Sequence, residues 1–449
     1  MGLRIARILF GALFACLLAM APAAARTPVA PTAHVAVHPL PPMGQNAVPF
    51  DAEKATDAYL AQVHGTARAR SDAYFEGGYW LLAIDALYAL LACGLLLWLK
   101  VSAWMRDNAA RITRSRFWQV PIYVVQFTIV LTVVTFPLTV YEQFFREHAY
   151  GLSNQSFLQW LGDFGILTGV NIVAFAVLLT LLYAVVRGAR ETWWLWGTVV
   201  TLAFVMFLQF VAPVFVAPLI NNYTPLKDGP LKEKILSVAR AEGIPATDVY
   251  EYDASRQTKE ISANVSGLFG TTRISLNDNL LKRCSEREIL AVVGHEMGHY
   301  VLSHTFIFLP WFAAIILLGF AFVNWGFRRL AGLFGGNWDV RTIDDPAGLP
   351  LIYALLTAYL FVMTPALNTL SRLAESQADI FGVNAVRQPD GFATAVLKLS
   401  EYRKLDPSPL EEFVFYDHPS GRNRIHMMMQ WKAEHLHDPD IAAGPVSPQ

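Results

Sequence analysis

The chain alternates between long apolar runs and polar stretches of varying length. Six of the apolar runs reach about the 20 residues that an α-helix needs to cross a bilayer. They span residues 79–99, 120–141, 164–186, 193–220, 306–327 and 349–370. The pattern predicts six transmembrane helices, and therefore a predominantly α-helical multi-pass membrane protein.

Almost no charge interrupts these runs. Asp85 is the single acidic or basic residue inside them. A carboxylate is costly in lipid, so its side chain must face protein or water. A packing contact with a neighbouring helix and a functional role both stay open for Asp85.

The N-terminus has the pattern of a secretory signal. Arg4 and Arg7 precede a short apolar stretch and an A-x-A cleavage site that ends at Ala25. We predict a signal peptide over 1–25, with an uncleaved N-terminal anchor as the alternative. Residues 26–78 are first Pro-rich and then polar and helix-favouring, which predicts an irregular segment followed by helix.

Lys and Arg are distributed unevenly among the loops. Ten of them lie in loops on one side of the predicted helices, and one lies in loop 142–163 on the other side. The ten belong to loops 100–119, 187–192 and 328–348. Basic residues favour the cytoplasmic side, so the polar stretches 221–305 and 371–449 should face the periplasm of a bacterial inner membrane.

Composition narrows the class of protein further. Apolar residues make up 54% of the chain and charged residues 16%, against about 25% charged in a soluble protein. The formal net charge of −1 gives no support for nucleic-acid binding. Cys16, Cys93 and Cys284 lie far apart without a CxxC pair, which argues against a disulfide framework and a Cys-based zinc site.

The polar stretch 221–305 combines helix and strand patterns. Residues 231–242 have helical spacing and residues 249–252 form a β-type run. Residues 261–276 are typical of a hairpin that turns near Gly270. We therefore predict a mixed α/β unit between the fourth and fifth transmembrane helices.

The last helix of this stretch carries an H-E-x-x-H motif. Ser285 at the N-cap and Glu288 three residues on mark its start. A spacing of four residues puts His295 and His299 on one face, where two imidazoles can bind one Zn²⁺. Glu296 can take a proton from water that zinc has acidified. For the motif by itself, an amphipathic helix with two surface histidines is an equal alternative.

A zinc peptidase needs a third protein ligand. His304 is one position away from the spacing of a histidine ligand and should point away from the His295–His299 face, which favours a structural role. A distant carboxylate is the other option, and Glu375 and Asp379 lie four residues apart just past the last apolar run. Glu375 can complete the zinc ligands, and Asp379 can accept a hydrogen bond from a ligand histidine.

Several separated motifs together resemble the integral-membrane CAAX prenyl endopeptidases of type 1, which are zinc metallopeptidases of the gluzincin group. The resemblance covers about residues 79–430, and its main support is the H-E-x-x-H helix with the distant Glu375 and Asp379. Shorter matches are Pro137-Leu138, Asn154-Gln155-Ser156, Ala212-Pro213, Thr224-Pro225-Leu226, Ala263-Asn264, Arg273-Ile274, His418-Pro419 and Arg424. The resemblance implies a ring of transmembrane helices and a gluzincin-like zinc peptidase domain with a small β-hairpin.

The resemblance also implies roles for the residues around the metal. His295, His299 and Glu375 would bind one Zn²⁺ per chain. Glu296 would be the general base, and Asp379 would hydrogen-bond to a zinc ligand.

Four further residues receive a role from the resemblance alone. His418 and Arg424 would be catalytic groups that contact the substrate or the developing oxyanion. The strand at Ala263 and Asn264 would bind the substrate by pairing with an extended peptide.

The sequence thus predicts a membrane-embedded zinc endopeptidase whose partners are the lipid bilayer and a membrane-associated peptide or protein substrate. Its site would face the periplasm, opposite to the cytosol-facing site of the family's eukaryotic members. A quality-control protease for envelope proteins, with the same chemistry, is one alternative. A catalytically silent, zinc-bound membrane scaffold is another, although a scaffold has no use for a base at Glu296.

Overall fold

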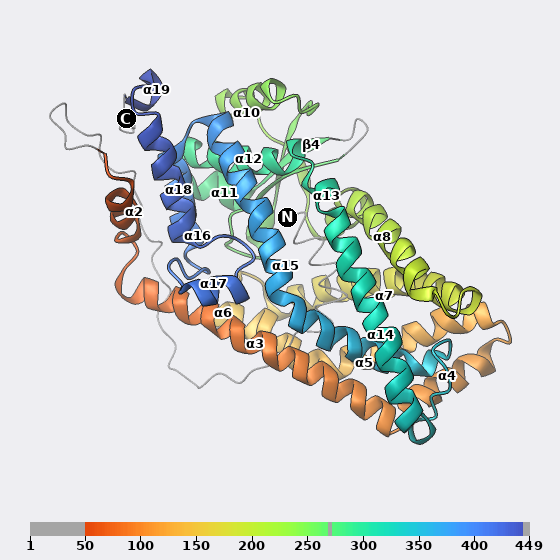
Figure 1. Cartoon of the computed structure of the whole chain (residues 1–449). Helices are drawn as coiled ribbons and strands as arrows, with labels where there is room; N and C mark the ends of the chain where they lie inside the picture. The colour runs from red at the N-terminus through yellow and green to blue at the C-terminus, as the bar shows by residue number, and fades with distance from the viewer. Residues whose placement is uncertain (1–49, 268–271, 443–449) are drawn as a thin grey trace.

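The computed structural model describes residues 50–267 and 272–442 of the chain. Long helices occupy one end of the molecule, and a small sheet with shorter helices occupies the other (Figure 1). The predicted signal peptide or anchor over 1–25 and the turn near Gly270 lie outside the described residues.

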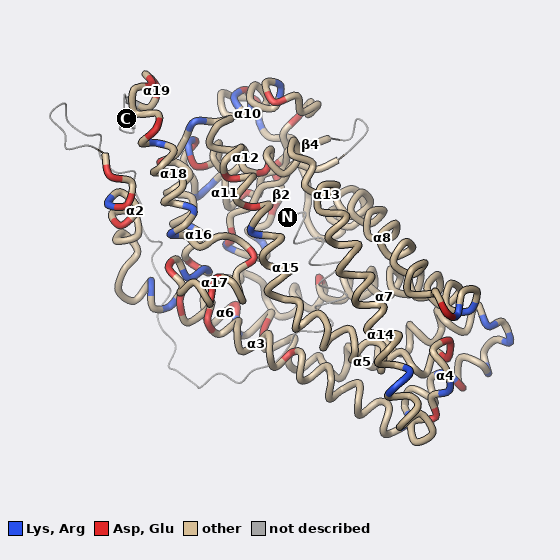
Figure 2. The backbone as a smooth tube through the Cα atoms, viewed as in Figure 1, with Lys and Arg blue, Asp and Glu red and all other residues tan. Residues whose placement is uncertain are grey.

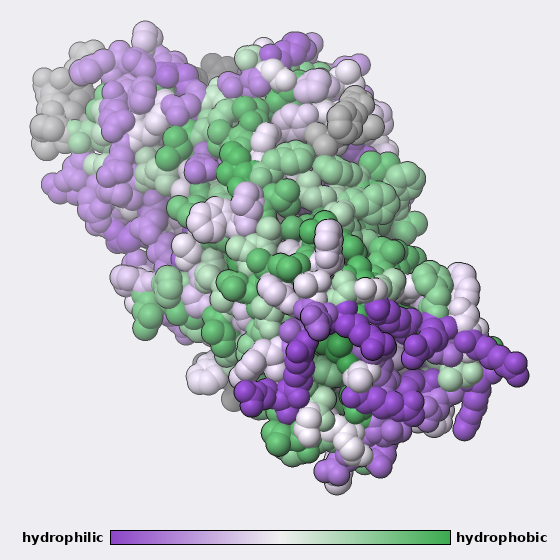
Figure 3. All heavy atoms as spheres, turned by 45° about the vertical axis from the view of Figure 1, so that its right-hand side comes forward, coloured by the Kyte–Doolittle hydropathy of each residue, from purple (hydrophilic) through white to green (hydrophobic). Residues whose placement is uncertain are grey.

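Within the described residues, six helical rods are long and apolar enough to cross a membrane, which confirms the prediction from the apolar runs. Their main helices are α3 (Gly65–Trp98), α5 (Arg116–Val140), α7 (Phe157–Gly188), α8 (Trp193–Val211), α14 (Leu309–Trp338) and α15 (Leu349–Val386). Much of their apolar surface faces outward, as at Val133 and Val362, which are 67% and 74% exposed. This surface forms a hydrophobic belt between two more hydrophilic ends (Figure 3), as a bilayer requires.

Two rods contain a π-helical segment. In the rod of α5, the π-helix η1 (Tyr141–Arg146) follows and leads into α6 (Glu147–Ala149). In the rod of α8, the π-helix η2 (Ala212–Val216) follows and leads into α9 (Ala217–Ile220). Pro213 has no backbone N–H to donate to the regular helical ladder, so the helix widens there. The carbonyl of Pro213 accepts a hydrogen bond from Arg273 Nη2 at 2.6 Å, which ties this rod to the sheet.

Asp85 lies inside the protein, as the cost of a carboxylate in lipid requires. Its side chain is 3% exposed and shares a hydrogen bond with the carboxyl group of Glu142 in η1. One of the two carboxyl groups must hold a proton for that bond to form. Asp85 therefore contacts a neighbouring rod, and together with Glu142 and Arg146 it also lines a polar cavity.

Charged side chains gather at the two ends of the rods, and the middle of the bundle is nearly free of them (Figure 2). At the end away from the sheet, α4 (Val101–Ile112) follows α3. Arg106 of α4 donates to Asp339 Oδ2 at 2.8 Å and to Asp345 Oδ2 at 3.1 Å. These ion pairs join α4 to the loop between α14 and α15.

The sheet has four short strands in the order β1-β2-β4-β3. They are β1 (Tyr223–Pro225), β2 (Val249–Tyr252), β3 (Ala263–Ser266) and β4 (Arg273–Asn277). β3 and β4 pair antiparallel, which confirms the predicted hairpin, and β2 pairs parallel with β4. The sequence analysis did not predict β1, because three residues ending in proline carry no strand pattern.

Shorter helices cover the sheet and complete the unit. They are α10 (Pro230–Ala241), η3 (Ala254–Arg256), α11 (Asp278–Arg283), α12 (Glu286–Val301), α13 (His304–Ile307), α16 (Pro389–Leu399), α17 (Pro409–Phe415), α18 (Gly421–Glu434) and α19 (Pro439–Ala442). A further short helix, η4 (Pro346–Gly348), lies at the other end of the molecule, just before α15. Ile235 of α10, Ile274 and Leu276 of β4 and Met297 of α12 are fully buried in one core. Burying this apolar surface is the main force that holds α10 and α12 against the sheet.

The first described helix, α2 (Ala52–Leu60), packs onto the C-terminal helices. Tyr59 is fully buried with Ile425 and Met428 of α18, and its hydroxyl donates to Asp390 Oδ1 at 2.6 Å. The polar segment that contains α2 therefore packs with the C-terminal helices in one core.

Helices α12 and α15 cross at very short distance because small residues face one another. A Cβ atom at Gly298 would lie 3.0 Å from the backbone of Ala378. A Cβ atom at Gly382 would lie 2.7 Å from the backbone nitrogen of His295. Such approach is open only to small side chains. It brings the H-E-x-x-H helix against the C-terminal half of α15.

Candidate active site

Local sequence fixes where α12 begins. Ser285 and Glu288 form the predicted capping box, in which the Ser285 N–H donates to Glu288 Oε2 at 2.6 Å. Lys398 of α16 also donates to Glu288 Oε2, at 2.7 Å. His295 and His299 then follow in the middle of a regular helix, and their Nε2 atoms lie 3.2 Å apart.

Helix α15 brings the distant carboxylate to these histidines. Glu375 Oε2 lies 3.2 Å from His295 Nε2, and Glu375 Oε1 lies 3.6 Å from His299 Nε2. One ligand atom from each of the three residues falls within 4.8 Å of the others. Among the described residues, this is the one His, Cys, Asp and Glu group with metal-binding geometry.

A chain of buried polar contacts orients His295. Its Nδ1 lies 2.6 Å from Asp379 Oδ1, and Arg424 donates to both oxygens of Asp379, at 2.6 and 2.8 Å. Burial lowers the pKa of His295, but the carboxylates of Asp379 and Glu375 outweigh burial and raise it to about 9. Without a cation, His295 therefore holds a proton, which a metal ion displaces on binding.

A second chain of contacts orients His299, and sequence analysis missed it. His299 Nδ1 lies 2.9 Å from His304 Nδ1, and His304 Nε2 lies 3.1 Å from Gln377 Oε1. The expectation that His304 points away from the ligand face was wrong. It assumed one continuous helix, whereas α12 ends at Val301 and Ser303 takes a left-handed conformation with φ of 51°.

A cavity of about 120 Å³ opens beside the three presumed ligands. Glu296, His418 and Arg424 line it together with Phe392 and Arg403. His418 Nε2 lies 3.2 Å from Glu375 Oε2. Burial, with Arg403 nearby, lowers the pKa of His418 to about 4, so this imidazole is neutral at physiological pH.

The edge strand β3 forms one wall of the same cavity. Ala263 lines the cavity together with Ile261 and Ser262. The side chain of Asn264 is buried and accepts a 3.4 Å hydrogen bond from Ser266 Oγ. Within the described residues, β3 pairs with β4 on one side only, which leaves its other edge as a place for an extended peptide.

The residues present fit a divalent metal ion. Two imidazole nitrogens and one carboxylate form a three-residue ligand set that leaves a coordination position for water or substrate. Glu375 Oε2 is buried, and its nearest polar neighbours are the Nε2 atoms of His295 and His418, each at 3.2 Å. A buried carboxylate is costly unless positive charge lies beside it, and here either a protonated His295 or a metal ion in its place meets that need.

Two family models match most of the described chain. The model of peptidase family M48 matches residues 225–432. A second model, described as "CAAX prenyl protease N-terminal, five membrane helices", matches residues 55–222.

Individual relatives and a solved structure agree with these matches. The metalloprotease YhfN of Bacillus subtilis (strain 168), whose name carries the label "uncharacterized", is 31% identical over 69% of this chain and 73% of its own length. A CAAX prenyl protease 1 homolog of Arabidopsis thaliana is 29% identical over 65% of this chain and 69% of its own length. The crystal structure of S. mikatae Ste24p has the same fold, with a TM-score of 0.63, 21% identity, and coverage of 87% of this chain and 92% of that chain.

The six rods, the H-E-x-x-H helix and the carboxylate that α15 brings to it define a membrane metalloendopeptidase. The chain belongs to peptidase family M48. A catalytically silent metal-binding scaffold is not favoured, because the matched family is one of peptidases.

Proposed function

We propose that the chain is a zinc-dependent endopeptidase that hydrolyses peptide bonds in membrane-associated polypeptides. The observation that supports this most strongly is the meeting of His295, His299 and Glu375, with Glu296 lining the same cavity. This is the donor set that zinc peptidases of the His₂Glu type use.

The proposed roles follow from the contacts. His295, His299 and Glu375 would hold the ion, which would supply Lewis acidity at the scissile carbonyl and at the attacking water. Glu296 would take a proton from that water and return it to the leaving nitrogen. Neutral His418 donates a hydrogen bond towards the oxygen on which negative charge develops.

Three residues orient the ligands: Asp379, Arg424 and His304. Asp379 accepts from the second nitrogen of His295, and Arg424 keeps Asp379 ionised. Arg424 is 6% exposed and its guanidinium is already bound to Asp379, so we assign it a positioning role alongside any contact with substrate. His304 accepts a hydrogen bond from the second nitrogen of His299 and so orients that ring.

The substrate would lie in extended form along β3. Ala263 is at the point where β3 borders the cavity, so a peptide added to this edge passes the ligands and Glu296. The relatives from Arabidopsis thaliana and Saccharomyces cerevisiae are named CAAX prenyl protease 1 homolog and CAAX prenyl protease 1, and we propose membrane-associated protein tails as the substrate class here. We further propose a bacterial inner membrane location with the site on the periplasmic side.

Replacement of the base tests the mechanism. Glu296→Gln in the purified full-length protein should retain one zinc ion while cleavage of a fluorogenic peptide falls by at least about 100-fold. Glu286→Gln, an exposed residue on the first turn of the same helix, is the matched control and should cleave normally. Activity that survives Glu296→Gln, or a parent protein without bound metal, contradicts the proposal.

A further inference from the structure

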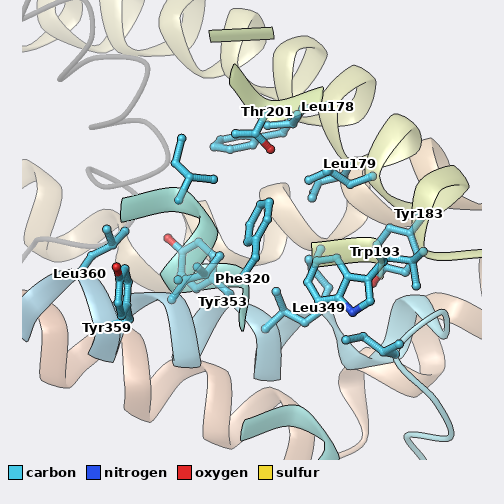
Figure 4. Close-up of a pocket in the computed structure, with 18 of the residues that line it drawn as sticks. Leu178, Leu179, Tyr183, Trp193, Thr201, Phe320, Leu349, Tyr353, Tyr359 and Leu360 are labelled. Atoms are coloured by element: carbon cyan, nitrogen blue, oxygen red, sulfur yellow. The ribbon is translucent and has the colours of Figure 1, made fainter. Parts of the chain in front are cut away.

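A second cavity lies inside the bundle of rods and is separate from the candidate active site. Its volume is about 130 Å³, and it shares no lining residue with the cavity at Glu296. Side chains from α5, α7, α8, α14 and α15 surround it (Figure 4). Its lining is almost wholly apolar, as at Leu178, Phe320 and Leu349.

The cavity is elongated along the helix axes. Tyr183 and Trp193 lie at one end, and Tyr359 and Leu360 lie at the other (Figure 4). Along α15, the lining runs from Leu349 to Leu360. At a rise of 1.5 Å per residue this is about 16 Å, close to half of the ~30 Å hydrocarbon thickness of a bilayer. The length matches the acyl region of one leaflet.

Water is a poor occupant of such a space. A single water needs roughly 10–15 Å³ of cavity and two to four polar partners. The volume would hold several waters, but the lining offers few polar atoms for them. An empty space would forfeit dispersion contacts on all its walls. An aliphatic chain fits both the shape and the chemistry of the lining.

The end of the cavity near Tyr183 has polar groups that lack partners. The Tyr183 hydroxyl, at this end, is buried and makes no hydrogen bond in the described structure, with the residue 3% exposed. The Thr201 hydroxyl, beside Leu178 nearer the middle of the cavity (Figure 4), is likewise buried without a partner, with the residue 6% exposed. Arg187 follows Tyr183 by one helical turn, with its guanidinium carbon 5.8 Å from the Tyr183 ring centre. Its Nε is also buried without a hydrogen-bond partner.

Positive charge surrounds this end. Arg187 Nη1 donates to the carbonyl of Arg116 at 2.8 Å, and Arg190 lies two residues beyond the end of α7. Three carboxylates lie near these arginines: Asp344, 3.9 Å from Arg190, Asp345, which Arg106 already pairs with at 3.1 Å, and Glu191, the residue after Arg190. Among the described residues, none of them lies within 4.0 Å of the Arg187 guanidinium. Guanidinium groups at this place suit a phosphate, which would satisfy the Nε of Arg187.

We infer that this cavity is a phospholipid site. One acyl chain of an anionic bilayer phospholipid fills the space between α7, α8 and α15, and its phosphate contacts Arg187. The chain is the apolar occupant that the lining requires, and the headgroup supplies the acceptor for the buried guanidinium nitrogen. Since α15 also carries Glu375, the bound lipid supports the helix that delivers a metal ligand.

Photolabelling of the full-length protein in detergent tests the site. Phosphatidylglycerol with a diazirine in the middle of one acyl chain should label lining residues of α7, α8 and α15 on illumination, as mapped by peptide mass spectrometry. An excess of unlabelled phosphatidylglycerol should suppress the labelling. Phosphatidylcholine should compete about tenfold less well, because it carries no net negative charge.

Matched variants separate the cavity from the outer surface. Thr201→Phe fills the cavity and should reduce labelling of its lining about tenfold. Val199→Phe adds similar bulk on the 56% exposed face of the same helix and should leave the labelling unchanged. Arg187→Gln should weaken phosphatidylglycerol binding about tenfold without closing the cavity, so the test does not depend on the folding of Thr201→Phe.

Three results would overturn the inference. They are labels confined to outward-facing residues, equal competition by both phospholipids, and unchanged labelling in Arg187→Gln together with Thr201→Phe. Because the readout is lipid binding, these results are independent of peptide cleavage.

Discussion

Each presumed metal ligand is held by a neighbour at its second polar atom. Asp379 and Arg424 hold His295, whereas His304 and Gln377 hold His299. A histidine that binds metal through Nε2 must carry its proton on Nδ1, which then donates to the neighbour. The two chains of contacts therefore select the tautomer that binds metal.

Asp379→Asn tests this support at the level of one residue. The amide is neutral, so it loses both the attraction to the His295 ring and the ion pair with Arg424. We expect zinc affinity to fall about 10- to 100-fold. The zinc content after dialysis against a series of chelator concentrations measures this affinity. Asp228→Asn, which changes an exposed carboxylate, is the control. Equal zinc affinity in the two variants would refute the role of Asp379.

The residue types of the site were predictable, but their contacts were only partly so. His295, Glu296 and His299 follow from a spacing within one helix, and Glu375 and Asp379 follow from a second such spacing. His304 was missed because its position depends on one left-handed residue, Ser303, which no helical pattern reveals. A cluster of three histidines within ten residues was the signal that could have found it.

At the scale of elements, the site depends on how closely α12 and α15 approach. Gly294 and Gly298 of α12 face Ala378 and Gly382 of α15. The small residues bring the backbones together, and the longer Glu375 reaches the histidines from one end of the contact. The same helices with larger residues would lie too far apart for three ligands to meet.

Gly382→Ala tests this contact. The new methyl group would lie 2.7 Å from the His295 backbone nitrogen, so the helices must separate. We expect a loss of about 1–3 kcal/mol in stability and weaker zinc binding. Thermal unfolding in detergent and zinc titration measure the two effects. Gly336→Ala on α14, where no atom lies within 4 Å, should be neutral or stabilising.

Asp278, at the start of α11, should give part of the stability a defined pH dependence. Burial raises its pKa, but hydrogen bonds from Lys282 and Ser255 outweigh burial and hold the pKa below its usual value of 3.8. A lowered pKa in the folded state means that the contribution is present above about pH 3.8 and is lost as the pH falls through the folded value.

Asp278→Asn should therefore destabilise the protein by about 1–3 kcal/mol near neutral pH, because it loses charge-assisted hydrogen bonds. As the pH falls through the lowered folded-state pKa, the carboxyl group of the parent becomes protonated, so the difference should shrink. Thermal unfolding of both proteins at neutral pH and over a series of falling acidic pH values measures this. A difference that stays constant would show that Asp278 contributes through shape rather than charge.

Element boundaries were harder to predict than element types. The first and last apolar runs were predicted as 79–99 and 349–370, whereas α3 begins at Gly65 and α15 continues to Val386. Polar residues end an apolar run but not a helix, since packing against other helices stabilises the extra turns. For α15 this extension is what carries Glu375 to the site.

At the scale of the whole molecule, the two ends differ in role. The sheet, α12 and the H-E-x-x-H motif lie at one end, and most loops rich in Lys and Arg lie at the other (Figures 1 and 2). The apolar belt between them fixes the direction of the membrane normal (Figure 3). The site and the basic loops must therefore lie on opposite sides of the bilayer.

Cysteine labelling tests whether the site end or the end with the basic loops faces the periplasm. In a background without the native cysteines, Ser115→Cys lies in a basic loop and Asp228→Cys lies at the site end. From the positive-inside rule we expect a membrane-impermeant maleimide to label Asp228→Cys in bacterial spheroplasts. Ser115→Cys should be labelled only after lysis, and the reverse pattern would place the site in the cytoplasm.

The sequence by itself determined the six transmembrane helices, the hairpin, the H-E-x-x-H helix and the residue types of a metallopeptidase. Those features depend on periodicity and spacing within single segments, where helix geometry alone relates one residue to the next. Only the tertiary structure decided the contact between α12 and α15, the turn that places His304 and the apolar cavity beside Arg187. These depend on packing between segments far apart in the chain, and no local pattern encodes such packing.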